Sequence, residues 1–140
     1  MTPEPVPPTP PHRPLRQTLR VLPALLWALG IWTLSSQADL PGGELDLPYL
    51  DKIAHAGLFA LLAGLSMLAG APARLAWILA TGWGVIDEFH QAFVPLRTPE
   101  LADLAADSVG ALLAVLAVKW LAPRRHGPGY PERSKRRSQR

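Results

Sequence analysis

Ionisable residues are concentrated in one stretch of the sequence, GVIDEFHQAFVPLRTPELADLAADSVG, which runs from Gly84 to Gly110. It holds five carboxylates together with one histidine, one glutamine and one arginine. A second, shorter group, DKIAH, begins at Asp51. Carboxylates and histidines can transfer protons or coordinate metal ions, and the cations Lys52 and Arg97 can bind a phosphate or a carboxylate. These two stretches therefore contain the residues from which a functional site would be built.

The spacing within the two stretches places the polar residues on common helix faces. Residues three or four positions apart lie on one face of a helix. Three sets are related in this way: Asp51 with His55, Asp87 with His90 and Gln91, and Asp103 with Asp107. Glu88 points about 100° away from Asp87. The sequence therefore predicts three helices that each present a short polar face.

Two chemical roles are open for these residues, catalysis and binding. In a catalytic interpretation, His55 or His90 is the general base and Glu88 donates a proton. A metal site is also conceivable, although the sequence contains no local metal-binding motif such as H-E-x-x-H. Its four ligands would be His55, Asp87, Glu88 and Asp107. We therefore expect a binding site rather than an active site, with no metal and no cofactor, and assign no catalytic residue.

Long apolar segments flank these polar residues. A membrane-spanning helix needs about 20 mostly apolar residues, and four segments approach that length: 19–36, 53–70, 73–94 and 101–122. Their middles contain neither proline nor charge, and none shows the alternation of a strand. We predict an all-α integral membrane bundle of four transmembrane helices. A soluble bundle would need polar helix faces, which these segments mostly lack, and the first segment is long for the apolar core of a signal peptide.

The two ends of the chain differ from its apolar middle. Residues 1–14 hold seven of the 16 prolines, and residues 123–140 hold seven Lys or Arg against one Glu. Both are predicted to be disordered tails that flank a membrane domain over residues 15–122. The chain has no cysteine, which excludes disulfides. Its net charge of +3 needs no nucleic-acid partner, because a basic tail beside a membrane is attracted to anionic lipid headgroups.

The distribution of basic residues predicts the orientation of the bundle. Arginines precede the first segment, join the second to the third and follow the fourth, whereas the other two connections carry acidic residues. By the positive-inside rule, both termini are cytoplasmic, and the chain is a multi-pass protein of the cell membrane. Three of the segments then bring their polar residues to the level of the outer face of this membrane.

We expect these residues to form an outward-facing, ligand-binding pocket. Its predicted members are Asp51, Lys52, His55, Asp87, Glu88, Gln91, Arg97, Asp103 and Asp107. A buried carboxylate needs a partner, and Arg97 is the expected partner of Asp87, with His55 next. Asp51 and Asp103 have a second interpretation, as residues that stabilise the N-termini of their helices.

Two blocks of the sequence resemble the VanZ-like membrane proteins. DKIAHAGLFALLAGL, from Asp51, is similar to the family's Asp-Lys-x-x-His helix start, and TLSSQ, residues 33–37, resembles the end of its first helix. The second block resembles the family motifs Asp-Glu-x-x-Gln, Pro-x-Arg and Asp-x-x-x-Asn-x-x-Gly, which here are Asp87, Glu88 and Gln91, then Pro95 and Arg97, then Asp103, Asp107 and Gly110. Two positions depart from this pattern. Asp107 stands where the family commonly has Asn, so a hydrogen-bonding role would here become ionic, and Leu96 stands where Gly is common.

The resemblance covers residues 15–122 and implies a role in the cell envelope. The family is named for a protein that lowers susceptibility to the glycopeptide antibiotic teicoplanin. We therefore expect membrane lipids as partners, and a lipid-linked cell-wall precursor or a lipoglycopeptide as the ligand that the pocket binds or shields. The alternative is a membrane-interface enzyme that acts on a lipid or glycan headgroup. A proton-linked carrier ranks third, because no inverted repeat is visible, and the oligomeric state stays open.

Overall fold

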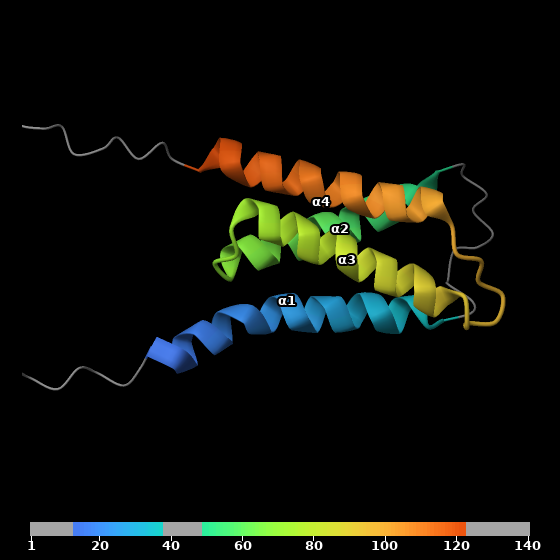
Figure 1. The fold of residues 1–140 in the computed structure, drawn as a ribbon, viewed down its shortest axis with the longest axis horizontal. Helices are drawn as coiled ribbons and strands as arrows, with labels where there is room; N and C mark the ends of the chain where they lie inside the picture. Colours follow the sequence, from blue (N-terminus) through green and yellow to red (C-terminus); the bar gives the residue numbers. More distant parts are fainter. Residues whose placement is uncertain (1–12, 38–48, 123–140) are drawn as a thin grey trace, which may run out of the picture.

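The computed structural model describes residues 13–37 and 49–122, and these ranges form four helices. They are α1 (Arg13–Ser35), α2 (Leu50–Leu68), α3 (Ala73–Gln91) and α4 (Leu101–Leu121). The helices lie side by side along one common direction, and each runs opposite to the one before it (Figure 1). The predicted all-α bundle is confirmed. Most of both predicted tails lies outside the described residues, although α1 begins at Arg13, two residues before the predicted boundary.

Three of the four helices are long and apolar enough to cross a membrane. They are α1 over Thr18–Ser35, α2 over Leu50–Leu68 and α4 over Leu101–Leu121. Judged by the same length, hydropathy and charge content, α3 is not among the candidate spans of the described residues. Its last turns contain Asp87, Glu88, His90 and Gln91, which lower its mean hydropathy. The chain is thus a helical membrane protein with three candidate spans, and the fourth span stays a prediction.

The closest helix packing is between α2 and α4. A Cβ built at Gly110 of α4 would lie 2.0 Å from the carbonyl oxygen of Ala56 on α2, so the two backbones approach as closely as a glycine allows. Near this contact, Phe59 and Ala63 of α2 and Ala111 of α4 are completely buried. Small residues at helix contacts are typical of membrane bundles, where packing rather than hydrophobic burial drives association. The α2–α4 pair is therefore the most closely packed part of the fold.

Helix α1 is attached more loosely than the other three. It contacts α2 and α3, and lies on the side of the bundle away from α4 (Figure 1). Its Leu19 and Leu26 are each 58% exposed, as expected for side chains that face lipid. Trp27 ties its middle to α2 by donating from Nε1 to the carbonyl of Leu58 at 2.9 Å. A helix held in this way leaves room for an apolar groove along one side.

Candidate functional site

The polar residues gather at the end of the bundle where α1 and α3 finish and α2 and α4 begin, which we call the polar end (Figure 1). The structure brings there residues from three helices: Asp51, Lys52 and His55 of α2, Asp87, Glu88 and Gln91 of α3, and Asp103 and Asp107 of α4. Most of the carboxylates are inside the protein, since Asp87, Glu88, Asp103 and Asp107 are all buried. These eight residues are called the polar cluster below.

Asp87 joins α3 to the last turn of α1. It is fully buried. Its Oδ2 accepts hydrogen bonds from the Ser35 hydroxyl at 2.7 Å and from the Gln91 amide at 3.1 Å. Ser35 is itself buried, so the contact lies in the interface rather than at its rim. Asp87 is therefore the acceptor that fixes the end of α1 against α3.

The prediction that Arg97 pairs with Asp87 is wrong. The Arg97 Nε donates instead to the main-chain carbonyl of Gln37, 3.1 Å away and just after α1. No ion pair between Arg97 and a carboxylate occurs within residues 18–37 and 49–122. The loop between α3 and α4 places Arg97 beside the end of α1, where its hydrogen-bond acceptor is a main-chain carbonyl rather than a carboxylate.

Lys52 is the cation of the polar cluster. Its Nζ lies 2.8 Å from Asp51, 2.6 Å from Glu100 and 2.7 Å from Asp103. The three carboxylates come from α2, from the residue before α4 and from the first turn of α4. Lys52 therefore holds the beginnings of α2 and α4 together. The Asp51 side chain remains 61% exposed although it pairs with Lys52.

Asp107 is fully buried between α2, α3 and α4. Its Oδ1 is hydrogen-bonded to His55 Nδ1 at 3.0 Å. Space for the carboxylate comes from Gly84 on α3, where a Cβ would lie 2.7 Å from Asp107 Oδ2. Glu88 follows one turn later, and its Oε2 accepts the backbone N–H of Glu100 at 2.7 Å. In this way the acidic side chains also set the distance between α3 and the start of α4.

The chain offers one donor set for a metal ion within its described part. His55, Glu88 and Asp107 each present one ligand atom, and these atoms lie within 4.8 Å of one another. Asp87 does not belong to this set, although the sequence suggested it could. The set comes from three different helices, so no local motif announces it.

Residues at the end of α1 and directly after it complete the polar end and were not assigned to the site from the sequence. Besides Ser35, Ser36 Oγ lies 2.9 Å from His90 Nε2. The Trp32 ring stacks on the His90 ring with their centroids 3.9 Å apart. The TLSSQ segment could have pointed to the two serines, because it resembles the VanZ-like family, but the resemblance did not indicate what its residues do.

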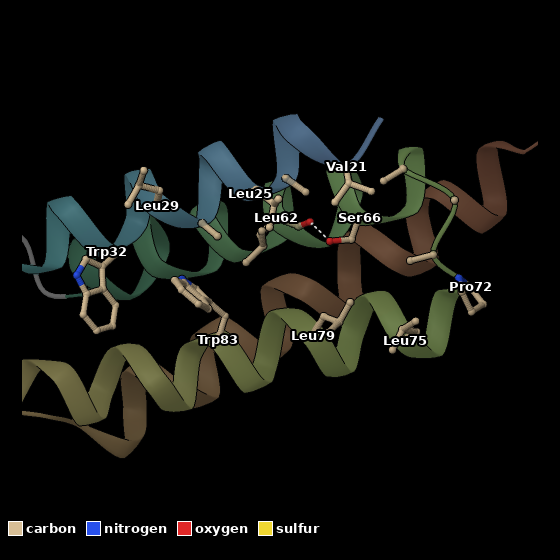
Figure 2. A pocket seen from close by; sticks show the side chains of 15 residues that line it. Val21, Leu25, Leu29, Trp32, Leu62, Ser66, Pro72, Leu75, Leu79 and Trp83 are labelled. Carbon is tan, nitrogen blue, oxygen red and sulfur yellow. Dashed lines mark hydrogen bonds between the residues drawn. The ribbon is translucent and has the colours of Figure 1, made fainter. Parts of the chain in front are cut away.

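An apolar groove runs along the bundle between α1 on one side and α2 and α3 on the other (Figure 2). Its volume is about 730 Å³. Leucines from both sides line it, including Leu25, Leu29 and Leu79, and its far end is closed by the α2–α3 turn at Pro72. At its near end stand Trp32 and Trp83 (Figure 2), and Trp32 is the residue that stacks on His90. The groove thus ends beside the polar end.

Together these features define an all-helical membrane protein with the polar cluster at one end of the bundle and an apolar groove that ends beside it. The VanZ/LLP1 family model matches residues 11–122, a range that includes all four helices and the connections between them. The chain therefore belongs to the VanZ/LLP1 family, as its motifs predicted. No curated protein and no solved structure matches it.

The turn before Arg97 contains a backbone conformation that favours glycine. Leu96 has φ = 63°, in the left-handed region that costs an L-residue about 1–2 kcal/mol, and its side chain is 84% exposed and buries little. We expect Leu96→Gly to raise the free energy of unfolding by up to about 1 kcal/mol, after the larger unfolded-state entropy of glycine is subtracted.

Unfolding in mixed detergent micelles would measure this effect, and Thr98→Gly is the matched control. Thr98 lies in the same loop and is exposed, but it has no positive φ. The control should leave stability unchanged or lower it. Equal changes for both variants would contradict the strain at Leu96.

Proposed function

We propose that this protein binds a lipid-linked ligand of the cell envelope, with the hydrocarbon tail in the apolar groove and the headgroup at the polar end. The observation that carries the proposal is that the two features share a boundary: Trp32 lines the end of the groove, and its ring stacks on His90 of the polar end. A ligand with an apolar body and a polar tip matches such a site, since pockets pair an apolar lining with a few polar groups.

The polar end offers a cation for the headgroup. Lys52 is occupied by three carboxylates, whereas Arg97 uses its Nε for a carbonyl at the end of α1. A guanidinium has five N–H donors and can bind a phosphate or carboxylate through two of them. Arg97 is therefore the residue we assign to a headgroup phosphate or carboxylate.

The envelope setting follows from the basic residues. The positive-inside rule puts both termini in the cytoplasm and the polar end at the outer surface of the cell membrane. Lipid-linked wall precursors and lipoglycopeptides such as teicoplanin both have an apolar tail in the membrane and a polar head at that level. The proposed activity is to bind or shield such a molecule, which would lower susceptibility to teicoplanin.

Filling the groove should remove this activity. We expect cells that produce the wild-type protein to resist teicoplanin more than vector-only cells. Leu79→Trp should abolish this difference, because Leu79 lines the groove and the larger ring occupies the space of the tail. Susceptibility to vancomycin, tested in parallel, should change little with either protein, since the groove recognises the tail. The measurement is the minimal inhibitory concentration at equal membrane abundance.

The matched control is Leu113→Trp on α4. Leu113 is 60% exposed, a value close to the 52% of Leu79, but it does not line the groove. It should retain full protection, and Arg97→Ala should lose part of it. Protection that survives Leu79→Trp at normal protein levels would overturn the groove as the binding site.

A second candidate function is chemistry on a lipid or glycan headgroup. It is favoured by the hydrogen bond between His55 and the buried Asp107, because a carboxylate that orients a histidine is a common arrangement around a general base. Release of a headgroup product by the purified protein, lost in His55→Gln, would identify it.

A further inference from the structure

Three side chains from three helices converge inside the polar end. His55 comes from α2, Glu88 from α3 and Asp107 from α4, and one ligand atom of each lies within 4.8 Å of the other two. Asp107 is fully buried and Glu88 is 8% exposed. Each carboxylate has one oxygen tied to the protein: Asp107 Oδ1 to His55, and Glu88 Oε2 to the Glu100 amide. The positions of both side chains are therefore set by the fold.

The second oxygen of each carboxylate has no protein partner. Glu88 Oε1 and Asp107 Oδ2 are buried and accept no hydrogen bond. Within residues 18–37 and 49–122, no Lys or Arg forms an ion pair with Glu88, Asp107 or the neighbouring Asp87, because Lys52 is bound to other carboxylates. A buried polar oxygen without a hydrogen bond is unfavourable. A cation placed between these two oxygens would satisfy both of them.

We propose that His55, Glu88 and Asp107 bind a divalent transition-metal ion, Zn²⁺ or Mn²⁺. Two carboxylates and one imidazole form a ligand set of the kind that Zn²⁺ uses when three protein ligands leave one position open. The imidazole favours a transition metal over Mg²⁺ or Ca²⁺, which prefer oxygen ligands alone. The ion would neutralise both carboxylates and join α2, α3 and α4 at their polar ends.

Gly84 contributes to this site through its lack of a side chain. Any Cβ there would lie 2.7 Å from Asp107 Oδ2, the oxygen without a partner. The cation site stands on these contacts and does not depend on the lipid-binding function.

The test is metal binding by the full-length protein, purified in detergent with a tag that contains no histidine and stripped with a chelator. Equilibrium dialysis against Zn²⁺ or Mn²⁺ should give about one ion per chain. Co²⁺ should give visible d–d absorption when it occupies the site, and Zn²⁺ should displace it. Glu88→Gln and Asp107→Asn should each weaken Zn²⁺ binding at least tenfold. Loss of an outer-shell partner alone costs 10–100-fold.

Two controls separate this site from other sources of binding. Asp51→Asn removes an exposed carboxylate at the same end of the bundle and should bind Zn²⁺ like wild type. Changing both His12 and His126 to Gln removes the two histidines outside the described helices as possible metal ligands, and Zn²⁺ binding should persist. Wild-type protein that binds no stoichiometric Zn²⁺ and gives no Co²⁺ spectrum overturns the proposal, whether or not the variants fold. Unchanged affinity in the Glu88→Gln, Asp107→Asn double variant overturns it equally.

Discussion

Replacing Gly110 by alanine should lower the free energy of unfolding by at least about 2–3 kcal/mol, the upper range for overpacking a tight contact. The new methyl group would stand 2.0 Å from the Ala56 carbonyl oxygen, and this oxygen belongs to a helix backbone that cannot rotate away. The helices α2 and α4 must then separate, which also loosens the packing around Phe59 and Ala111. Reversible unfolding in mixed detergent micelles measures the change, and the variant should accumulate poorly in membranes.

The sign of this effect distinguishes close packing from ordinary helix propensity. Glycine inside a helix is normally worse than alanine by about 0.5–1 kcal/mol. Gly64→Ala is the matched control, because Gly64 lies inside α2 and a Cβ there meets no atom within 4 Å. The control should gain up to about 1 kcal/mol of stability. A gain for Gly110→Ala as well would mean that α2 and α4 do not touch at this point.

Replacing Asp87 by alanine should destabilise the bundle by about 2–6 kcal/mol, since it leaves two buried donors without their partner and each costs about 1–3 kcal/mol. The change removes the acceptor of both the Ser35 hydroxyl and the Gln91 amide. Because Ser35 is the last residue of α1, the expected result is early release of α1 from α3. Hydrogen exchange should therefore increase first in the last two turns of α1.

Two further variants interpret the result for Asp87. Asp87→Asn retains an acceptor oxygen and should lose less stability than Asp87→Ala. Asp51→Ala removes a carboxylate that is 61% exposed and pairs with Lys52, and it should lower stability by no more than about 1 kcal/mol, as the loss of an exposed ion pair usually does. If Asp87→Ala behaved like Asp51→Ala, the contact between Asp87 and Ser35 would not hold α1 in place.

The amino-acid sequence by itself determined the helices and the end at which the polar residues meet. Helix α4 begins and ends within one residue of the predicted segment 101–122, because a long apolar run has only one low-energy backbone in lipid. The spacing of Asp51 and His55 and of Asp103 and Asp107 placed each pair on a common helix face. The motif spacing also identified the family, which the match over residues 11–122 confirmed.

The tertiary structure alone decided which polar groups are partners. Lys52 rather than Arg97 became the central cation, and Ser35 rather than a cation became the partner of Asp87. The sequence allowed a metal site that also included Asp87, and only the structure showed that His55, Glu88 and Asp107, from three helices, are the residues whose ligand atoms lie together. The physical reason is that helix periodicity sets which residues share a face, whereas partners across helices depend on rotation and separation. In this bundle both are set by contacts such as Gly110 on Ala56 and Gly84 beside Asp107.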